Sequence, residues 1–111
     1  MKKIILSTLF IFLTFTFVIA QDYTTPNTGV TWTLDDIAAA SPTTITISGS
    51  EYTLLGNLTI SENDAVIIDS DLTLLIDEAK LVTVFGAFTV DSNAVTITAL
   101  DENTPYDGFR F

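Results

Sequence analysis

The strongest constraint on the fold is a series of short apolar, β-branched segments that begins at Thr43 and continues toward the end of the chain. Val, Ile, Thr and Phe favour extended backbone because their side chains pack well on a pleated sheet. Gly, Asn, Asp and Ser, which favour turns, separate the segments about every eight residues. The pattern predicts strands at Thr44–Ile47, Tyr52–Leu55, Leu58–Ile60, Ala65–Ile68, Leu72–Ile76, Leu81–Phe85, Phe88–Val90 and Val95–Ala99.

Residues 21–42 carry a different pattern. The polar stretch 21–32 contains proline and glycine and predicts an irregular lead-in, with Trp32 as its first anchor in a core. The segment 33–40 begins with a threonine that can cap a helix, continues with two acidic residues that suit the helix dipole, and spaces its apolar side chains three and four positions apart. It therefore predicts a two-turn helix that is stopped by Ser41-Pro42.

A repeat is visible when the sequence is shifted by sixteen residues, which aligns Leu58 with Leu74 and Val90. We interpret two strand–turn units as one period. Alternation, as in Leu58-Thr59-Ile60, places one apolar set inward and Thr outward. Such units bury their apolar faces only by stacking, so the pattern favours a solenoid, with helix 33–40 covering its open edge.

The turn and strand sequences also resemble a known family. The similarity rests on Gly56–Ser61, Ala65–Ile68, Leu72–Leu74, Val95–Ala99 and Asp107–Phe111. On these residues the chain, over about residues 30–111, resembles secreted bacterial proteins with a right-handed parallel β-helix of the pectate-lyase-like kind. The resemblance implies an N-terminal cap followed by opening coils, which we place at residues 21–42 and 43–111. Because Phe111 falls within a strand, we expect the coils to be truncated at the C-terminus.

An antiparallel β-sandwich is the alternative fold, since short strands with frequent turns also predict it. The chain has no Asn-Gly or Asp-Gly pair between two strands, which is the strongest local signal for a hairpin. This favours the solenoid.

Residues 1–20 have the composition of a cleavable signal peptide: two lysines, an apolar run and a small residue at Ala20 before Gln21. The apolar run, of about sixteen residues with three threonines, is short for a spanning helix, which needs about twenty apolar residues. We expect cleavage near Ala20–Gln21, and a secreted or cell-surface protein with no stable membrane span.

Charge and composition exclude several classes of function. Without the leader, Lys80 and Arg110 stand against all fourteen acidic residues, a net charge of −12, which disfavours nucleic acid and anionic membranes as partners. The chain contains no cysteine for disulfides and no histidine for catalytic triads or zinc sites.

Carboxylates are the main candidates for chemistry, and they lie close together in the sequence: Asp64, Asp69, Asp71, Asp77, Glu78 and Asp91. They would suit a glycosidase pair or a calcium site, but all lie at turns, where Asp commonly bonds the local backbone. We name no catalytic residue, cofactor or firm metal site, and retain Asp69 and Asp71 as candidates for a weak calcium contact. Only Lys80 and Arg110 could act as the base of a polysaccharide lyase, and neither matches such a motif.

Two further features of the sequence suit ligand binding at the surface. Outward threonines, with Thr73 and Thr89 sixteen positions apart, would form a flat ladder like that of ice-binding solenoids, although Thr is also simply a good residue for an exposed strand. Tyr23, Trp32, Tyr52 and Tyr106 could stack on sugars, while core or cap packing is the simpler use of Trp32 and Tyr52.

The sequence favours a non-catalytic structural role: the cap and first coils of a secreted or surface β-solenoid binding or adhesion protein, with a glycan or other surface ligand bound through downstream coils. The alternative is the non-catalytic N-terminal part of a glycan-degrading β-helix enzyme, which would need acids together with Lys, Arg or His on one face of later coils. A small self-contained binding module is a third class, and it would require the chain to fold alone without disulfides.

Overall fold

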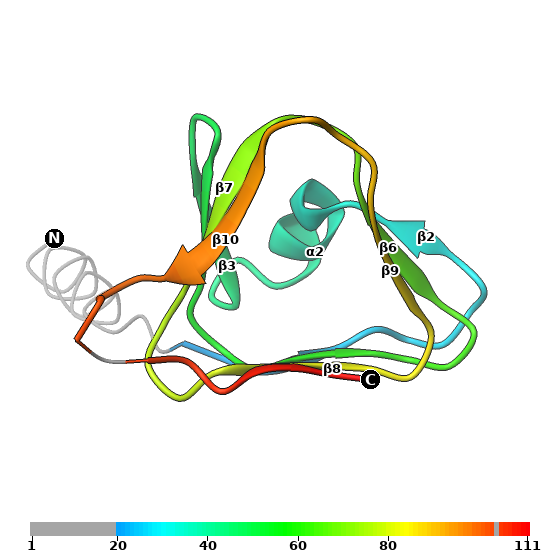
Figure 1. Ribbon diagram of the computed structural model, residues 1–111. Helices are drawn as coiled ribbons and strands as arrows, with labels where there is room; N and C mark the ends of the chain where they lie inside the picture. The colour runs from blue at the N-terminus through cyan, green and yellow to red at the C-terminus, as the bar shows by residue number, and fades with distance from the viewer. Residues whose placement is uncertain (1–19, 104) are drawn as a thin grey trace, which may run out of the picture.

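The computed structural model describes residues 20–103 and 105–111, so residues 1–19 of the predicted signal peptide lie outside it. Over the described residues the chain is mostly β, with parallel sheets and one short helix (Figure 1). The elements are β1 Tyr23–Thr24, β2 Thr31–Trp32, α2 Leu34–Ala40, β3 Ile45–Ser48, β4 Glu51–Leu54, β5 Leu58–Ile60, β6 Ala65–Ile68, β7 Leu72–Ile76, β8 Leu81–Val84, β9 Ala87–Val90, β10 Val95–Ala99 and β11 Gly108–Arg110.

The strands form three sheets, whose orders are β1-β5-β8-β11, β10-β7-β4-β3 and β2-β6-β9. From β4 onward, consecutive strands enter the three sheets in turn, and the chain traces a triangular outline around the core (Figure 1). Every strand pairing in the described residues is parallel except that of β3 with β4. The alternative prediction of an antiparallel β-sandwich is therefore wrong.

The sixteen-residue period is also wrong, because one circuit of the chain contains three strands and not two. Tyr52 on β4 pairs with Leu74 on β7, a separation of 22 residues, and Leu58 on β5 pairs with Val82 on β8, a separation of 24. Strand–turn units of about eight residues explain both values: three units make one circuit, whereas the shift of sixteen superimposed strands that belong to different sheets.

The eight predicted strands are confirmed, four of them residue for residue: Leu58–Ile60, Ala65–Ile68, Leu72–Ile76 and Val95–Ala99. Two strands in the polar lead-in were missed. β1 and β2 are only two residues each, and they are extended because they pair with β5 and β6. Trp32 on β2 packs against the core, as predicted, with its ring edge-on to Tyr23.

The predicted helix is confirmed as α2. The Thr33 side chain accepts a hydrogen bond from the Asp36 N–H, the Asp36 carboxylate accepts one from the Thr33 N–H, and Ser41 ends the helix. Leu34 and Ile37 are buried in the core, and the helix contacts β2, β3 and β6. These contacts place the helix at the end of the core where the chain begins its circuits, and Figure 1 shows it inside the triangular outline.

One hairpin was missed. β3 and β4 are joined by Gly49 and Ser50, with Ser48 opposite Glu51. Gly49 has φ +63°, the conformation that a two-residue type II′ turn requires at its first position. The turn itself was predicted, but Gly-Ser is a less recognisable hairpin sequence than Asn-Gly or Asp-Gly.

The core is a column of inward-facing aliphatic side chains from the three sheets. Strand β7 shows the alternation that the sequence predicted, with Leu72, Leu74 and Ile76 buried and the intervening residues half-buried. The other buried apolar residues are Leu34, Ile37, Ile45, Tyr52, Leu54, Leu58, Ile60, Val66, Ile68, Val82 and Val84.

Candidate functional site

The end of the core opposite α2 is not covered by any described residue. We call it the uncovered end and define it by the inward-facing side chains of the last strands: Phe88, Val90, Val95, Ile97 and Phe109. β9, β10 and β11 are each at the edge of their sheet, so each has one side without a partner strand. This end therefore combines apolar side chains with unpaired backbone groups.

Exposure changes sharply between this layer and the one beneath it. Val66 and Ile68 on β6 are 0 % and 1 % exposed, whereas Val90, which lies opposite Ile68, is 47 % exposed. The Phe109 ring contacts two other aromatic rings. The Phe88 ring meets it edge-on, with 5.1 Å between the ring centroids, and the Phe111 ring is stacked with it. Phe111 is 82 % exposed. Side chains of the last circuit are thus exposed to solvent, whereas the inward-facing side chains of the earlier circuits are buried.

Asp64 is the most strongly held carboxylate in the described structure. It is 2 % exposed, and its oxygens accept hydrogen bonds from four consecutive backbone N–H groups: Asn27 at 2.7 Å, Thr28 at 3.1 Å, Gly29 at 2.9 Å and Val30 at 3.1 Å. One side chain in the turn before β6 thereby fixes the loop between β1 and β2. Its position at a turn predicted hydrogen bonds to the local backbone, whereas the carboxylate accepts bonds from a distant loop.

These contacts also shift the titration of Asp64. Burial raises the pKa of its carboxyl group, but the hydrogen bonds it accepts, first from the Val30 N–H and then from the Thr25 hydroxyl, outweigh burial, so the pKa lies below the usual 3.8. Asp64 is therefore ionised at neutral pH and unsuited to donating a proton.

The candidate calcium residues lie in the turn between β6 and β7. Asp71 accepts hydrogen bonds from the Ser92 hydroxyl and, at 3.1 Å, from the Ala94 N–H, and these bonds lower its pKa. Asp69 is exposed. Within residues 20–103 and 105–111, no group of three or more acidic side chains is arranged to hold a metal ion. Calcium binding at Asp69 and Asp71 stays a prediction.

The remaining candidates are dispersed. Lys80 lies in the turn before β8, while Arg110 lies on β11 opposite Thr83. Tyr52 is buried, and its hydroxyl donates to Asp35 Oδ1 at 2.7 Å, so packing and not sugar stacking is its role. The bond to Asp35 and burial raise the pKa of Tyr52 to about 12.

The threonine ladder was assigned to the wrong partners. Thr73 pairs with Thr96 in one sheet, whereas Thr89 lies in another. A different row does form, in which Thr24, Thr59 and Thr83 lie side by side on β1, β5 and β8.

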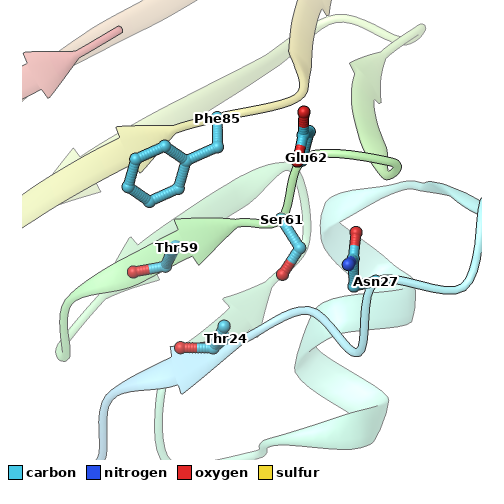
Figure 2. A pocket seen from close by; sticks show the side chains of 6 residues that line it. All are labelled: Thr24, Asn27, Thr59, Ser61, Glu62 and Phe85. Carbon is cyan, nitrogen blue, oxygen red and sulfur yellow. The ribbon is translucent and has the colours of Figure 1, made fainter.

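A shallow groove lies beside this row, at the ends of β1, β5 and β8. Its volume is about 550 Å³, and we call it the Phe85 groove after the aromatic residue among those lining it: Thr24, Asn27, Thr59, Ser61, Glu62 and Phe85 (Figure 2). Sequence reasoning missed it. The alternation of Val82 and Val84 inward would have placed Phe85 outward, but only the pairing of the sheets brings Asn27 and Glu62 beside it.

Comparison with protein-family models, with curated proteins and with solved structures gives no match in any of the three. In the part of the chain that the structure describes, no helix has the length and apolarity to cross a membrane.

Proposed function

We propose that this chain is a non-catalytic architectural segment: the cap and opening coils of a right-handed parallel β-helix in a secreted or surface binding or adhesion protein. The support is a chain that visits three parallel sheets in rotation, with separations of 22 and 24 residues between paired positions. Crossovers between parallel strands are right-handed in nearly all proteins. The resemblance to pectate-lyase-like β-helix proteins points to the same architecture.

The uncovered end carries the proposal. It presents three free strand edges around an apolar layer, while α2 covers the other end of the core. Full burial of a large apolar side chain stabilises a protein by about 1.5–3 kcal/mol, and an exposed side chain lacks this contribution. An added layer of parallel strands would bury this layer and pair the edges at the same time. We infer that the end serves as the stacking surface for further β coils.

Export completes the proposal. The composition of residues 1–20 supports secretion with cleavage near Ala20–Gln21. Expression of the full coding sequence in a secreting bacterium, followed by intact-mass measurement of the exported product, tests it. A mature chain that begins at Gln21 is expected, and a product that stays in the cell with its leader attached would contradict export.

Self-association of the exported chain tests the stacking surface. Because nothing described covers the uncovered end, we expect concentration-dependent association in analytical ultracentrifugation and binding of the apolar dye ANS. Val90→Lys, at the uncovered end, should weaken both effects at least about tenfold, since a charge there must be desolvated. Val30→Lys is the matched control, because Val30 is 45 % exposed against 47 % for Val90 and lies on a different part of the surface.

A monomeric wild-type chain that does not bind ANS and unfolds cooperatively would contradict the proposal, because it would mean that the end needs no further layer. Equal loss of association in both lysine variants would also contradict it, since the effect would then come from net charge alone.

A further inference from the structure

We propose that the Phe85 groove binds one ring of a neutral saccharide. The site lies on the outer side of the sheet formed by β1, β5, β8 and β11, away from the strand edges of the uncovered end. The inference does not depend on the stacking of further coils, because every lining residue belongs to the described structure.

The aromatic surface is the first observation. Phe85 is 68 % exposed although it follows a strand whose Val82 and Val84 are buried. Figure 2 shows its ring at one side of the groove, close to Thr59 on the neighbouring strand. A pyranose ring presents a face of C–H groups that packs on an aromatic ring and a rim of hydroxyls that does not. An exposed phenyl ring bordered by polar groups suits such a ligand.

The polar groups around the ring are the second observation. Within the described residues, the hydroxyls of Thr24 and Thr59 and the carboxylate of Glu62 make no hydrogen bond to the protein. The Asn27 side chain accepts a bond from the Asn63 N–H at 2.8 Å through its Oδ1, which leaves its amide N–H groups to donate. Donors and acceptors are thus both available on the rim of the groove, as sugar hydroxyls require.

The groove is also held in place before any ligand arrives. Asn27 has φ +65° and donates its backbone N–H to Asp64 Oδ2, so the buried carboxylate fixes the position of this side chain. On the facing turn, the Ser61 N–H donates to Thr25 Oγ1 at 2.8 Å, and the Ser61 hydroxyl donates to the Thr25 carbonyl oxygen. A pre-formed site loses less conformational entropy on binding.

Charge selects among saccharides and against other ligands. No lysine or arginine lines the groove, Glu62 does, and the chain is strongly acidic, so uronates, phosphates and nucleic acids are disfavoured. β1, which carries Thr24, is an edge strand of this sheet, so the hexapeptide in the test below shows whether an extended peptide adds to that edge instead. A neutral sugar ring satisfies the charge condition.

Saturation-transfer difference NMR tests the inference on the exported chain, because the method observes the sugar protons and works equally when the protein self-associates. The probes are the neutral β-1,4-linked hexasaccharides of glucose, xylose and mannose, with hexagalacturonate and a serine- and glycine-containing hexapeptide for comparison. We expect transfer to at least one neutral hexasaccharide at millimolar concentration and little transfer to the uronate.

Phe85→Ala should weaken that binding at least about tenfold, and Phe85→Tyr should retain it, because the second variant keeps the ring. Phe111→Ala is the matched control, since Phe111 is an exposed aromatic residue that does not line the groove. The inference is overturned by no transfer to any neutral probe, by preference for the uronate or the peptide, or by equal losses in Phe85→Ala and Phe111→Ala. None of these outcomes depends on the association state that tests the stacking surface.

Discussion

Replacement of Gly86 by alanine should destabilise the protein because of a steric clash, and not because of the backbone conformation at this glycine. Gly86 lies between β8 and β9, directly against the turn that precedes β6. A Cβ atom built on Gly86 lies 1.9 Å from the Asp64 carbonyl oxygen and 2.4 Å from that of Ser61. Non-bonded carbon and oxygen atoms rarely approach within about 3.3 Å. The turn must therefore move by more than about 1 Å to admit one methyl group.

The magnitude follows from what that movement breaks. The Asp64 carbonyl accepts a hydrogen bond from the Ala87 N–H at 3.2 Å, and the Gly86 N–H donates to the Ile60 oxygen at 3.4 Å. Two such bonds contribute about 1 kcal/mol each, and forcing a group into packed structure adds about 1–3 kcal/mol. Reduced freedom of the unfolded chain offsets about 0.4–1 kcal/mol. We expect a net loss of about 3 kcal/mol.

Urea unfolding followed by far-UV circular dichroism measures this loss, with Gly49→Ala as the matched control. Gly49 has φ +63° and no atom within 4 Å of an added Cβ, so its substitution should cost only about 1–2 kcal/mol of backbone strain. If Gly86→Ala fails to fold while Gly49→Ala folds, the argument stands. If Gly86→Ala proves as stable as Gly49→Ala or the wild type, the close approach of the two turns is refuted.

Three further substitutions test individual contacts. Asp64→Asn should lower the urea midpoint of unfolding at pH 7. Because the pKa of Asp64 is depressed in the folded state, the difference in midpoint between wild type and variant should be present above pH 4 and should shrink as the pH falls through the folded pKa. A difference that does not depend on pH would contradict this. Ala79→Gly should stabilise the protein by about 1 kcal/mol in thermal unfolding, since Ala79 has φ +57°, and a loss of stability would show that the methyl group packs. Asp35→Asn should bring the pKa of Tyr52 down from about 12 in an ultraviolet titration. In the wild type, the contribution of Tyr52 to the free energy of unfolding should decline as the pH rises from 10 toward 12.

Much of the local structure could be predicted because it depends on neighbouring residues. The capping of α2 by Thr33 and the strand 72–76 follow from side-chain preferences and from alternation over a few positions. The same local argument found the turn at Gly49, although not the hairpin that it forms. These features would be expected of the isolated segments, whichever fold they joined.

The candidate surfaces depend on pairings between distant residues, and for these the sequence was a poor guide. The sequence of a strand shows which of its side chains alternate, but it does not show which strand lies beside it. For this reason units of about eight residues suggested a period of sixteen, with two strands in each circuit and not three. Likewise, Asp64 looked like one turn carboxylate among six until the fold placed it beside residues 27–30.

From Thr43 onward, the sequence by itself determined where the chain is extended, where it turns and which side chains face inward. It also determined how the helix begins and ends, since all of these features follow from short-range sterics and apolar periodicity. Only the tertiary structure decided that three strands make a circuit, that β1 and β2 exist, that the last circuit is uncovered and that Phe85 borders a polar groove. The physical reason is that parallel pairing joins residues more than twenty positions apart, and its register is chosen by the packing of the whole core.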